Sequence, residues 1–305
     1  MKRRTFIKKS GLATVYISTG AFKFSDIPLH KLTKLTILHT NDVHSRIDPF
    51  PMDGGKYQGL GGAAARAAVI DKIRQNESAV ILLDAGDIFQ GTPYFNEFKG
   101  EIEFKLMSKM NYDAATIGNH DFDLGIKGLH KQLPHANFDF INCNYNLKDT
   151  ILHDKVSLYK IYKKGDVKIG VLGVGIELQG LVPKNLYGDT QYLDPIVSAN
   201  KIAELLRKEK NCNYVICLSH LGYSYRGNKI SDKDLAAQTS NIDLIIGGHT
   251  HTFLKNAETK LNAEGKEVLI SQVGWGGINL GHIEVVFEKN FKSKCTLCKN
   301  TLIKN

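Results

Sequence analysis

The sequence predicts an α/β fold, and three features of the chain support that prediction. Short apolar runs that suit buried strands alternate with longer stretches whose apolar residues recur three and four positions apart, as on one face of a helix. The runs are apolar throughout, which is typical of a sheet covered on both faces. With 305 residues, 42% of them hydrophobic, the chain can form one large domain of this kind or two small ones.

The expected elements follow one another in order from about residue 33. Strands are expected in the runs LTILH, AVILLDAGD, DAATIGNH, FDFINCN, VKIGVLGVG, YVICLSH, IDLIIGGHTH, VLISQVG and HIEVVF. Helices are expected between them, most clearly at residues 61–76 and 195–210, where the apolar spacing fits a helix packed on a sheet. The alternation continues to about residue 287.

The net formal charge of +9 raises the question of nucleic-acid binding. Residues 1–34 carry +7 and residues 283–305 carry +3, so the body between them carries −1. A surface that binds a phosphate backbone needs its positive charge on the folded body, where this chain has none in excess. The charge distribution therefore argues against nucleic acid as a partner.

Residues 1–32 are interpreted as an export signal of the twin-arginine type with its linker. Arg3 and Arg4 precede a short, mildly apolar stretch from Gly11 to Phe22, which is too short for a stable membrane-spanning helix. A disordered basic tail is the alternative. No other run approaches the ~20 apolar residues that a spanning helix needs, so an exported, periplasmic protein is expected.

The five cysteines predict little chemistry. Cys143, Cys212 and Cys217 lie in or beside apolar runs and are expected to be buried small hydrophobic residues. Cys295 and Cys298 have the spacing of a redox motif or of half a zinc site, but no second pair completes four ligands. A disulfide and an inert pair both remain open for them.

Five of the expected strands end in polar residues that can bind metal. Ligands of open α/β sheets bind beyond the carboxyl ends of the strands, so strands that run in the same direction would bring these residues to one rim. Each residue alone would be an ordinary turn former or helix cap. On an extended segment, two residues at a spacing of two would reach the same ion. The candidates are Asp42, His44, Asp87, Asn119, His220, His249 and His251.

These donors are imidazole nitrogens with carboxylate and amide oxygens, a mixture that suits Mn, Fe, Co, Zn or Mg. Seven donors are too many for one ion, but they fit two divalent ions that share a bridging carboxylate. Such a pair can hold a bridging hydroxide and stabilise an in-line displacement at phosphorus. The chain contains neither G-x-S-x-G nor G-x-x-x-x-G-K-[ST], so no competing catalytic motif is present.

The order and content of these motifs resemble the calcineurin-like metallophosphoesterase family. The motifs are Asp42-x-His44, GD ending at Asp87, GNHD at Asn119, SH at His220, and GHTH. Within the family they look like the catalytic domain of the periplasmic 5′-nucleotidase group, and the resemblance covers residues 33–288. It implies a four-layer sandwich of two mixed β-sheets flanked by helices.

The resemblance also implies a role for each candidate. One ion would be held by Asp42, His44 and His251, the other by Asn119, His220 and His249, with Asp87 bridging them. His120 and Asp123 resemble the catalytic pair of the family. Asp123 would orient the imidazole of His120, which would stabilise the transferring phosphoryl group or protonate the leaving oxygen. Asn119 and His120 would contact the substrate.

The implied function is a dinuclear-metal phosphoesterase that hydrolyses nucleotide phosphomonoesters. Cyclic nucleotides or nucleoside diphosphate sugars are alternative substrates. Two non-catalytic alternatives are a metal- or nucleotide-binding module and an interaction protein with structural metals. Residues 289–305 are expected to be a basic tail in place of the nucleotide-specificity domain of the family, so a separate specificity chain is a further expected partner. Aromatic residues that would stack near the rim are Tyr94, Phe95, Tyr223, Tyr225 and Trp275.

Overall fold

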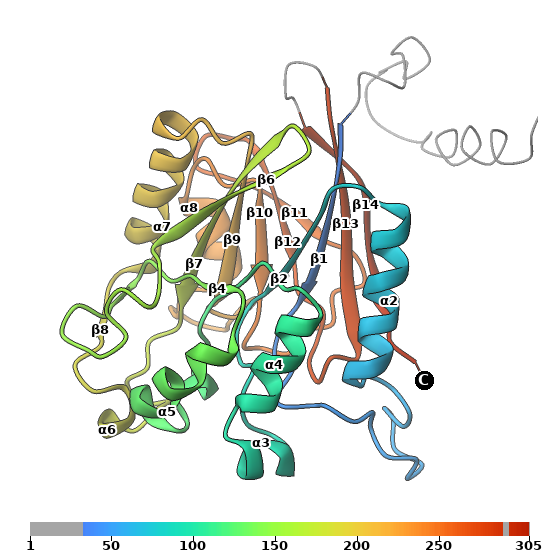
Figure 1. The fold of residues 1–305 in the computed structure, drawn as a ribbon. Helices are drawn as coiled ribbons and strands as arrows, with labels where there is room; N and C mark the ends of the chain where they lie inside the picture. The colour runs from blue at the N-terminus through green and yellow to red at the C-terminus, as the bar shows by residue number, and fades with distance from the viewer. Residues whose placement is uncertain (1–32, 289–292, 305) are drawn as a thin grey trace, which may run out of the picture.

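The computed structural model describes residues 33–288 and 293–304 of the chain, so the predicted export signal at residues 1–32 lies outside the described residues. Two six-stranded sheets lie face to face, with helices on their outer sides (Figure 1). Both sheets contain parallel and antiparallel neighbours. The predicted α/β class and the implied four-layer arrangement of two mixed sheets are therefore confirmed.

The first sheet is built around β1, which has one antiparallel and one parallel neighbour. Leu38 of β1 lies opposite His282 of β13 in an antiparallel pair and opposite Leu82 of β2 in a parallel pair. In spatial order the strands are β14 (Ser293–Leu302), β13 (Asn279–Phe287), β1 (Thr33–Thr40), β2 (Val80–Asp84), β3 (Ala114–Ala115) and β4 (Asp139–Phe140).

The second sheet has a parallel centre and two antiparallel edges. In spatial order its strands are β11 (Glu258–Leu261), β12 (Glu267–Ser271), β10 (Leu244–Gly247), β9 (Tyr214–His220), β7 (Val167–Gly175) and β6 (Tyr159–Lys164). A separate antiparallel pair joins β5 (Tyr145–Asn146) to β8 (Gln191–Tyr192). All nine predicted strand runs contain a strand of the structure.

Helices cover the outer face of each sheet (Figure 1). The longest predicted helices are confirmed, as α2 and as α7 with the π-helical turn that continues it. The helices that pack on the first sheet are α2 (Ala63–Asn76), α3 (Pro93–Phe98), α4 (Glu101–Lys109) and α5 (Gly125–Gln132). The remaining segments are α6 (Lys184–Tyr187), α7 (Pro195–Glu204), the π-helical turn Leu205–Glu209, α8 (Asp232–Gln238), and the 3₁₀ turns His120–Phe122 and Leu133–His135.

Three apolar layers hold the sheets and helices together. The layer between the sheets explains why the central strands are apolar on both faces; it includes Ile37, Ile81, Ile169, Val171 and Ile216. The layer outside the first sheet includes Ile70 of α2, Phe104 of α4 and Leu129 of α5. The layer outside the second sheet includes Ile202 of α7, Leu235 of α8 and Cys217 of β9.

Residues 293–302 correct the prediction of a tail at residues 289–305. They form β14, which pairs along β13 from Asn279 opposite Leu302 to Phe287 opposite Ser293. After the strand, Ile303 is fully buried and its backbone N–H donates to the carbonyl of Ile278 at 2.8 Å. Edge strands commonly carry lysine, which prevents further pairing, and such a strand is easily mistaken for a tail.

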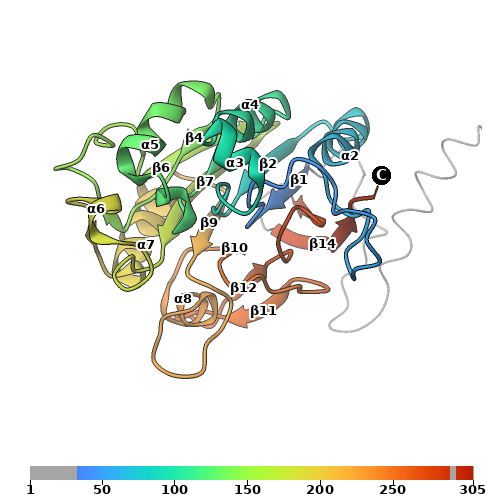
Figure 2. The same ribbon diagram turned by 90° about the horizontal axis from the view of Figure 1, so that it is seen from below.

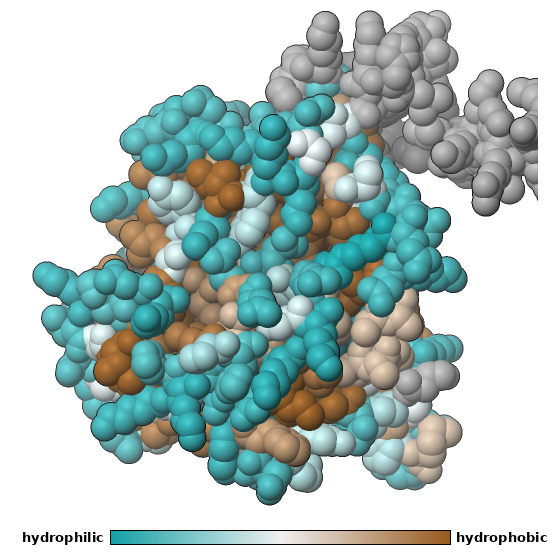
Figure 3. Space-filling model, in the orientation of Figure 1, coloured by the Kyte–Doolittle hydropathy of each residue, from teal (hydrophilic) through white to brown (hydrophobic). Residues whose placement is uncertain are grey.

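Cys143, Cys212 and Cys217 are buried free thiols, as predicted. Cys298 is disulfide-bonded, and the side chain of Cys295 lies outside the described residues. In the described part of the chain, every helix is too short or too polar to cross a membrane. On the face shown in Figure 3, hydrophilic side chains dominate and the apolar areas are separate patches.

Candidate metal centre

The seven candidate ligands lie at one rim of the sandwich, beyond the carboxyl ends of five strands. Figure 2 shows the molecule from this side, with the ends of β1, β2, β9 and β10 near one another. Within each of two groups, one possible ligand atom from each residue lies within 4.8 Å of the others. The groups are Asp42 with His44 and His251, and Asp87 with His220 and His249.

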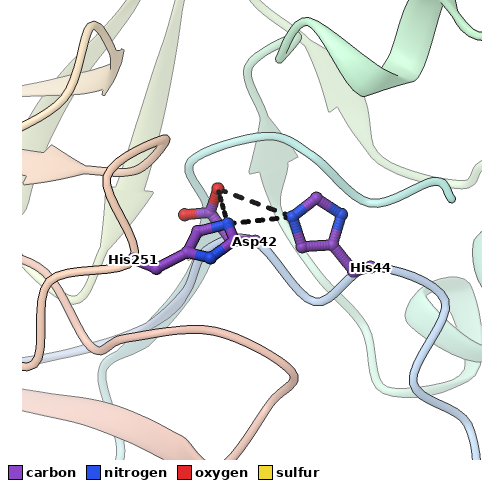
Figure 4. A group of neighbouring side chains, drawn as sticks. All are labelled: Asp42, His44 and His251. Carbon is purple, nitrogen blue, oxygen red and sulfur yellow. Dashed lines mark hydrogen bonds and ion pairs between the residues drawn. The ribbon is translucent and has the colours of Figure 1, made fainter. Parts of the chain in front are cut away.

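The first group surrounds a single point (Figure 4). The Nε2 atoms of His44 and His251 lie 3.0 Å apart, and Nε2 of His251 lies 3.4 Å from Oδ1 of Asp42. Nδ1 of His44 lies 3.2 Å from the carbonyl oxygen of Phe89, to which a proton on Nδ1 would donate. That hydrogen bond leaves the lone pair of Nε2 directed at the point between the three side chains, as a metal ligand requires.

The second group has the same arrangement around His220. Nδ1 of His220 lies 2.6 Å from the carbonyl oxygen of Ala85, which favours a proton on Nδ1. Nε2 is buried without a hydrogen-bond partner and lies 3.1 Å from Oδ2 of Asp87. An unpartnered buried nitrogen beside a carboxylate is costly unless a positive charge lies between them. Oδ1 of Asn119, which is 2.8 Å from Nδ1 of His249, brings the seventh candidate to this group.

Asp87 lies between the two groups. Its Oδ2 is 3.1 Å from Nε2 of His220 and 3.9 Å from Nε2 of His44. Oδ1 of Asp42 is in turn 3.9 Å from Nε2 of His220. Two adjacent sets of nitrogen and oxygen donors with a carboxylate between them fit a pair of divalent cations. The role of each of the seven residues as a ligand stays a prediction.

The electrostatics of the second group also favour a cation. Burial alone would raise the pKa of Asp87, but the neighbouring imidazoles, His220 first, lower it well below its usual range. Burial would lower the pKa of His220, but the carboxylates Asp87 and Asp42 raise it to about 10. Burial and the charge of His220 lower the pKa of His249 to about 4. The carboxylates thus favour a positive charge at this point. When a cation binds there, His220 must give up the proton on Nε2, because only the neutral imidazole is a ligand.

The backbone that carries these side chains is left-handed at several positions. The φ angles are 48° at Asp42, 50° at His44, 57° at Asp87, 70° at His249 and 52° at His251. Such angles are uncommon for residues with a Cβ and concentrate at functional sites. The interpretation that two histidines at a spacing of two on an extended segment point the same way is wrong for His249 and His251, because the segment is not extended at either residue and the two lie in different groups.

Gly248 allows the segment to pass close to both groups. A Cβ at this position would lie 2.8 Å from Nδ1 of His220 and 3.1 Å from Oδ2 of Asp42. Any other residue would therefore collide with one candidate ligand from each group. Glycine at this position, which has no Cβ, thus lets the backbone approach the candidate ligands closely.

Asp121 is a residue of the site that the sequence analysis missed. Its fully buried carboxylate accepts hydrogen bonds from the backbone N–H groups of Gly118 at 2.8 Å, Asp87 at 3.0 Å and Ile88 at 2.9 Å. Burial raises its pKa to about 7. Asp121 therefore joins the loop after β2 to the loop after β3 and fixes Asp87 relative to Asn119. The only signal in the sequence is a second carboxylate in GNHDFD.

Asn41 is a second missed residue, with a similar role on the other side. Its Nδ2 donates to Oδ2 of Asp42 and to the carbonyl oxygen of Gly274, both at 2.6 Å, while its Oδ1 accepts from the N–H of Val273 at 2.9 Å. The backbone N–H of His249 also donates to the Asp42 carboxylate, at 3.0 Å. These bonds hold Asp42 in one orientation, as outer hydrogen bonds commonly do for metal ligands.

His120 and Asp123 form the hydrogen bond that the resemblance implied. Nδ1 of His120 lies 3.0 Å from Oδ2 of Asp123, and this bond raises the pKa of His120. The backbone N–H of His120 donates to Oδ1 of Asp87 at 2.8 Å. The imidazole is 38% exposed, and it borders an open cavity of about 280 Å³. The cavity is lined by His44, Gln90, Gly91, His120, His251 and Trp275.

Only one of the five aromatic candidates lines that cavity. Trp275 does, with its ring nearly parallel to that of His251. Phe95 is buried in the apolar layer beside Phe89. Tyr94 donates to Oδ2 of Asp48 at 2.7 Å, and Tyr223 donates to Glu258. Tyr225 donates to the carbonyl oxygen of Leu221, so these hydroxyls have structural partners.

Comparison with known proteins gives one consistent family. The chain is 35% identical over 275 residues to a snake venom 5′-nucleotidase of Gloydius brevicauda, covering 84% of this chain and 45% of that protein. The fold matches a 5′-nucleotidase precursor of Thermus thermophilus with a TM-score of 0.79 at 30% identity, covering 89% of this chain and 55% of that one. It matches an NAD nucleotidase of Haemophilus influenzae with a TM-score of 0.78 at 27% identity, covering 90% and 51%.

The chain thus spans about half the length of these relatives. The sequence model of the family described as calcineurin-like phosphoesterase matches residues 35–253. This match contains all seven candidate ligands and covers well over half of the chain. The chain therefore belongs to the calcineurin-like phosphoesterase family.

Proposed function

We propose that this chain hydrolyses phosphomonoesters of nucleotides at the candidate metal centre. The observation that carries the proposal is the pair of adjacent donor groups, with Asp87 between them and an open cavity beside them. When bound, two divalent cations activate water and neutralise charge on the oxygens of a phosphoryl group. The names of the relatives, 5′-nucleotidase and NAD nucleotidase, support a nucleotide as substrate.

The residues of the chain have distinct roles in this proposal. Asp42, His44 and His251 would hold one ion, Asn119, His220 and His249 would hold the other, and Asp87 would be shared between them. Hydrogen bonds behind the donors keep them in place. In His44 and His220, Nδ1 donates to a backbone carbonyl, so the lone pair of Nε2 is left for the ion. Binding of both ions thus requires little rearrangement of the side chains.

His120 acts on the substrate in this proposal, with Asp123 as its positioning residue. The bond from Nδ1 to Asp123 fixes the ring, and the raised pKa favours the charged imidazolium. A charged donor at the edge of the cavity stabilises the transferring phosphoryl group or gives a proton to the leaving oxygen. Asn119 is proposed to contact the substrate as well as an ion.

The substrate range is open to direct assay. Cyclic nucleotides and nucleoside diphosphate sugars are tested beside the monophosphates, and the likeness to an NAD nucleotidase adds dinucleotides. A separate chain that supplies nucleotide specificity stays a prediction. Its signature is a large gain in kcat/KM for nucleotides, but not for p-nitrophenyl phosphate, when that chain is added.

The decisive experiment compares Asp87→Asn with Asp154→Asn. Both aspartates have left-handed φ, 57° and 61°, so the two substitutions test the same change on the same backbone. Asp154 lies on the surface with 84% of its side chain exposed. The purified protein with Asp87→Asn is expected to lose at least about a hundredfold in hydrolysis of p-nitrophenyl phosphate, because loss of a shared ligand exceeds the 10–100-fold typical of outer-shell changes. Full activity of that variant would contradict the proposal.

We further propose that the protein is exported by the twin-arginine route to the periplasm. The support is the pair Arg3 and Arg4 before a short apolar stretch. Replacement of both by lysine keeps the charge and is expected to leave the protein in the cytoplasm, as measured by fractionation. Unchanged export of the double variant would contradict this route.

A further inference from the structure

The single tryptophan of the chain borders the candidate metal centre. The sequence contains one Trp, Trp275, and it lines the cavity of about 280 Å³ into which His44, His120 and His251 also face. The indole ring lies nearly parallel to the imidazole of His251, with 5.8 Å between ring centroids and 12° between planes. An aromatic wall therefore adjoins the polar part of the cavity.

The indole is held in a fixed position by other aromatic rings. Phe50 contacts it edge-on at 5.2 Å and 84°, and Tyr57 at 6.0 Å and 87°. Tyr57 is itself stacked on Phe253 at 6.0 Å and 16°. Edge-to-face contacts of this kind are favourable, and a side chain that is already ordered loses little entropy when a ligand binds to it.

The backbone around Trp275 ties the wall to the metal centre. The N–H of Gly276 donates to the carbonyl oxygen of Asp42 at 2.7 Å. Gly274 and Gly276 have φ of 85° and 63°, a conformation that glycine adopts without strain. The turn therefore places the indole at a defined distance from a candidate ligand of the first ion.

The cavity thus combines two chemistries. The imidazoles and the adjacent metal donors suit a phosphate, and the indole next to His251 suits a flat apolar ring. The guanidinium of Arg46 lies 4.2 Å from the centre of the Phe50 ring and adds positive charge next to the ring that contacts the indole. Pockets that bind small ligands are lined mainly by apolar and aromatic groups, with a few polar groups that fix orientation.

We infer that Trp275 forms a stacking site for the base of a nucleotide whose phosphate lies at the metal centre. The inference rests on the proposed function and assigns recognition of the base to a residue of this chain. Stacking of a base on an aromatic side chain changes binding by roughly tenfold or more. It accepts any base, because every base has a flat π face. Nucleotides are thus preferred over ring-free phosphoesters without strong selection among bases.

The first test uses the fluorescence of the unmodified protein. Because Trp275 is the only tryptophan, the emission excited at the red edge of tryptophan absorption reports on this ring alone. Titration with adenosine is expected to quench it, whereas ribose is expected to leave it unchanged. Neither compound carries a phosphate, so the response does not depend on hydrolysis. Equal responses to the two compounds, or none to adenosine, would overturn the inference.

The second test is the ratio of kcat/KM for adenosine monophosphate to kcat/KM for ribose 5-phosphate. Trp275→Leu is expected to lower this ratio about tenfold, and Trp275→Phe to restore most of it. Tyr94→Leu is the matched control, because Tyr94 follows Gln90 closely in sequence but does not line the cavity. An unchanged ratio in Trp275→Leu overturns the stacking site. Absence of hydrolysis for every ester refutes the proposed function instead, and the fluorescence test still decides whether the base binds.

Discussion

Each donor group of the candidate metal centre has two buried residues and one half-buried histidine, but the groups differ in where their imidazoles lie relative to the cavity. The side chain of His220 in the second group is 0% exposed, whereas that of His251 in the first group is 39% exposed. His220 is fixed by the carbonyl of Ala85 inside the sandwich. His251 faces the cavity and lies beside Trp275. The first group thus contributes His44 and His251 to the lining of the cavity, whereas Asp87, His220 and His249 of the second group do not line it.

This difference separates two tasks within one centre. Electrostatic attraction between a cation and a carboxylate is stronger where water is excluded. The second group, which contains the fully buried His220 and does not line the cavity, is therefore expected to hold its ion more tightly. Catalytic metal sites also need an open coordination position for water or substrate. The first group, with an imidazole exposed to the cavity, meets that need. We therefore expect the second group to bind its ion more tightly, and the first group to leave a coordination position open for water or substrate.

The largest expected effect separates the two groups directly. His220→Ala should lose the second-group ion on dialysis and lower hydrolysis by at least about a hundredfold, since loss of an outer-shell partner alone costs 10–100-fold. His251→Ala should lower the affinity for the first-group ion, and excess metal in the assay should restore the activity. Elemental analysis and activity after metal addition measure both effects.

His153→Ala is the control for these variants, because that imidazole is 55% exposed beside Asp154 on the surface. It should retain metal content and activity. Two results would contradict this assignment of the tighter site to the second group. One is loss of the more tightly held ion in His251→Ala, and the other is full recovery of activity in His220→Ala when metal is added.

The next effect concerns turnover without metal loss. His120→Ala should lower kcat by about 10²–10⁴, the usual contribution of a general acid or base, and it should keep its bound metal. The reason is that the contact with Asp87 is made by the backbone N–H of His120, which the substitution retains. Asp123→Asn should have a smaller effect, because it only orients the ring. Metal loss in His120→Ala would show that the residue braces the ligands instead.

The strands of the sandwich were predictable where their burial is uniform. All nine apolar runs contain strands, because strands buried on both faces carry no polar alternation. The edge strands β6, β11 and β14 were missed, since each carries lysine, such as Lys163, Lys260 and Lys299. An edge strand is exposed on one side, and its sequence then resembles that of a loop or tail.

The candidate site was predictable in its residue types but not in its local geometry. Strand ends that carry His, Asp and Asn indicated a metal rim without any structure. Spacing alone did not separate His249 from His251, because the spacing rule assumes an extended segment and both residues have left-handed φ angles. Asp121 was missed because its partners are backbone N–H groups of other loops. Such partners have no signature in the sequence.

A smaller effect is expected where the two loops are joined. Asp121→Asn replaces one of two accepting oxygens by a donor, so at least one buried N–H among those of Gly118, Asp87 and Ile88 loses its acceptor. Each such loss costs about 1–3 kcal/mol, and metal affinity should fall about 10–100-fold. Urea unfolding and metal titration measure the two quantities. Unchanged metal affinity would show that the ligands are positioned independently of this carboxylate.

An effect on stability instead of activity is expected at Asp232, beside the second group. Oδ1 of Asp232 accepts from Oγ of Ser219, the neighbour of His220, at 2.5 Å, while Oδ2 is buried without a partner. Burial raises its pKa to about 8. The native state therefore binds a proton that the unfolded state releases near pH 4, and stability falls as pH rises from about 4 to 8.

Asp232→Asn removes this titration while keeping an acceptor for Ser219. Urea unfolding across that pH range, with metal chelated so that its own pH dependence is absent, should show a flatter slope in the variant. The difference should reach a few kcal/mol, at about 1.36 kcal/mol per unit of pKa shift. Identical slopes would mean that Asp232 is ionised in the folded protein. The second group would then lie beside a third negative charge, and its tighter hold on a cation would come from charge as much as from burial.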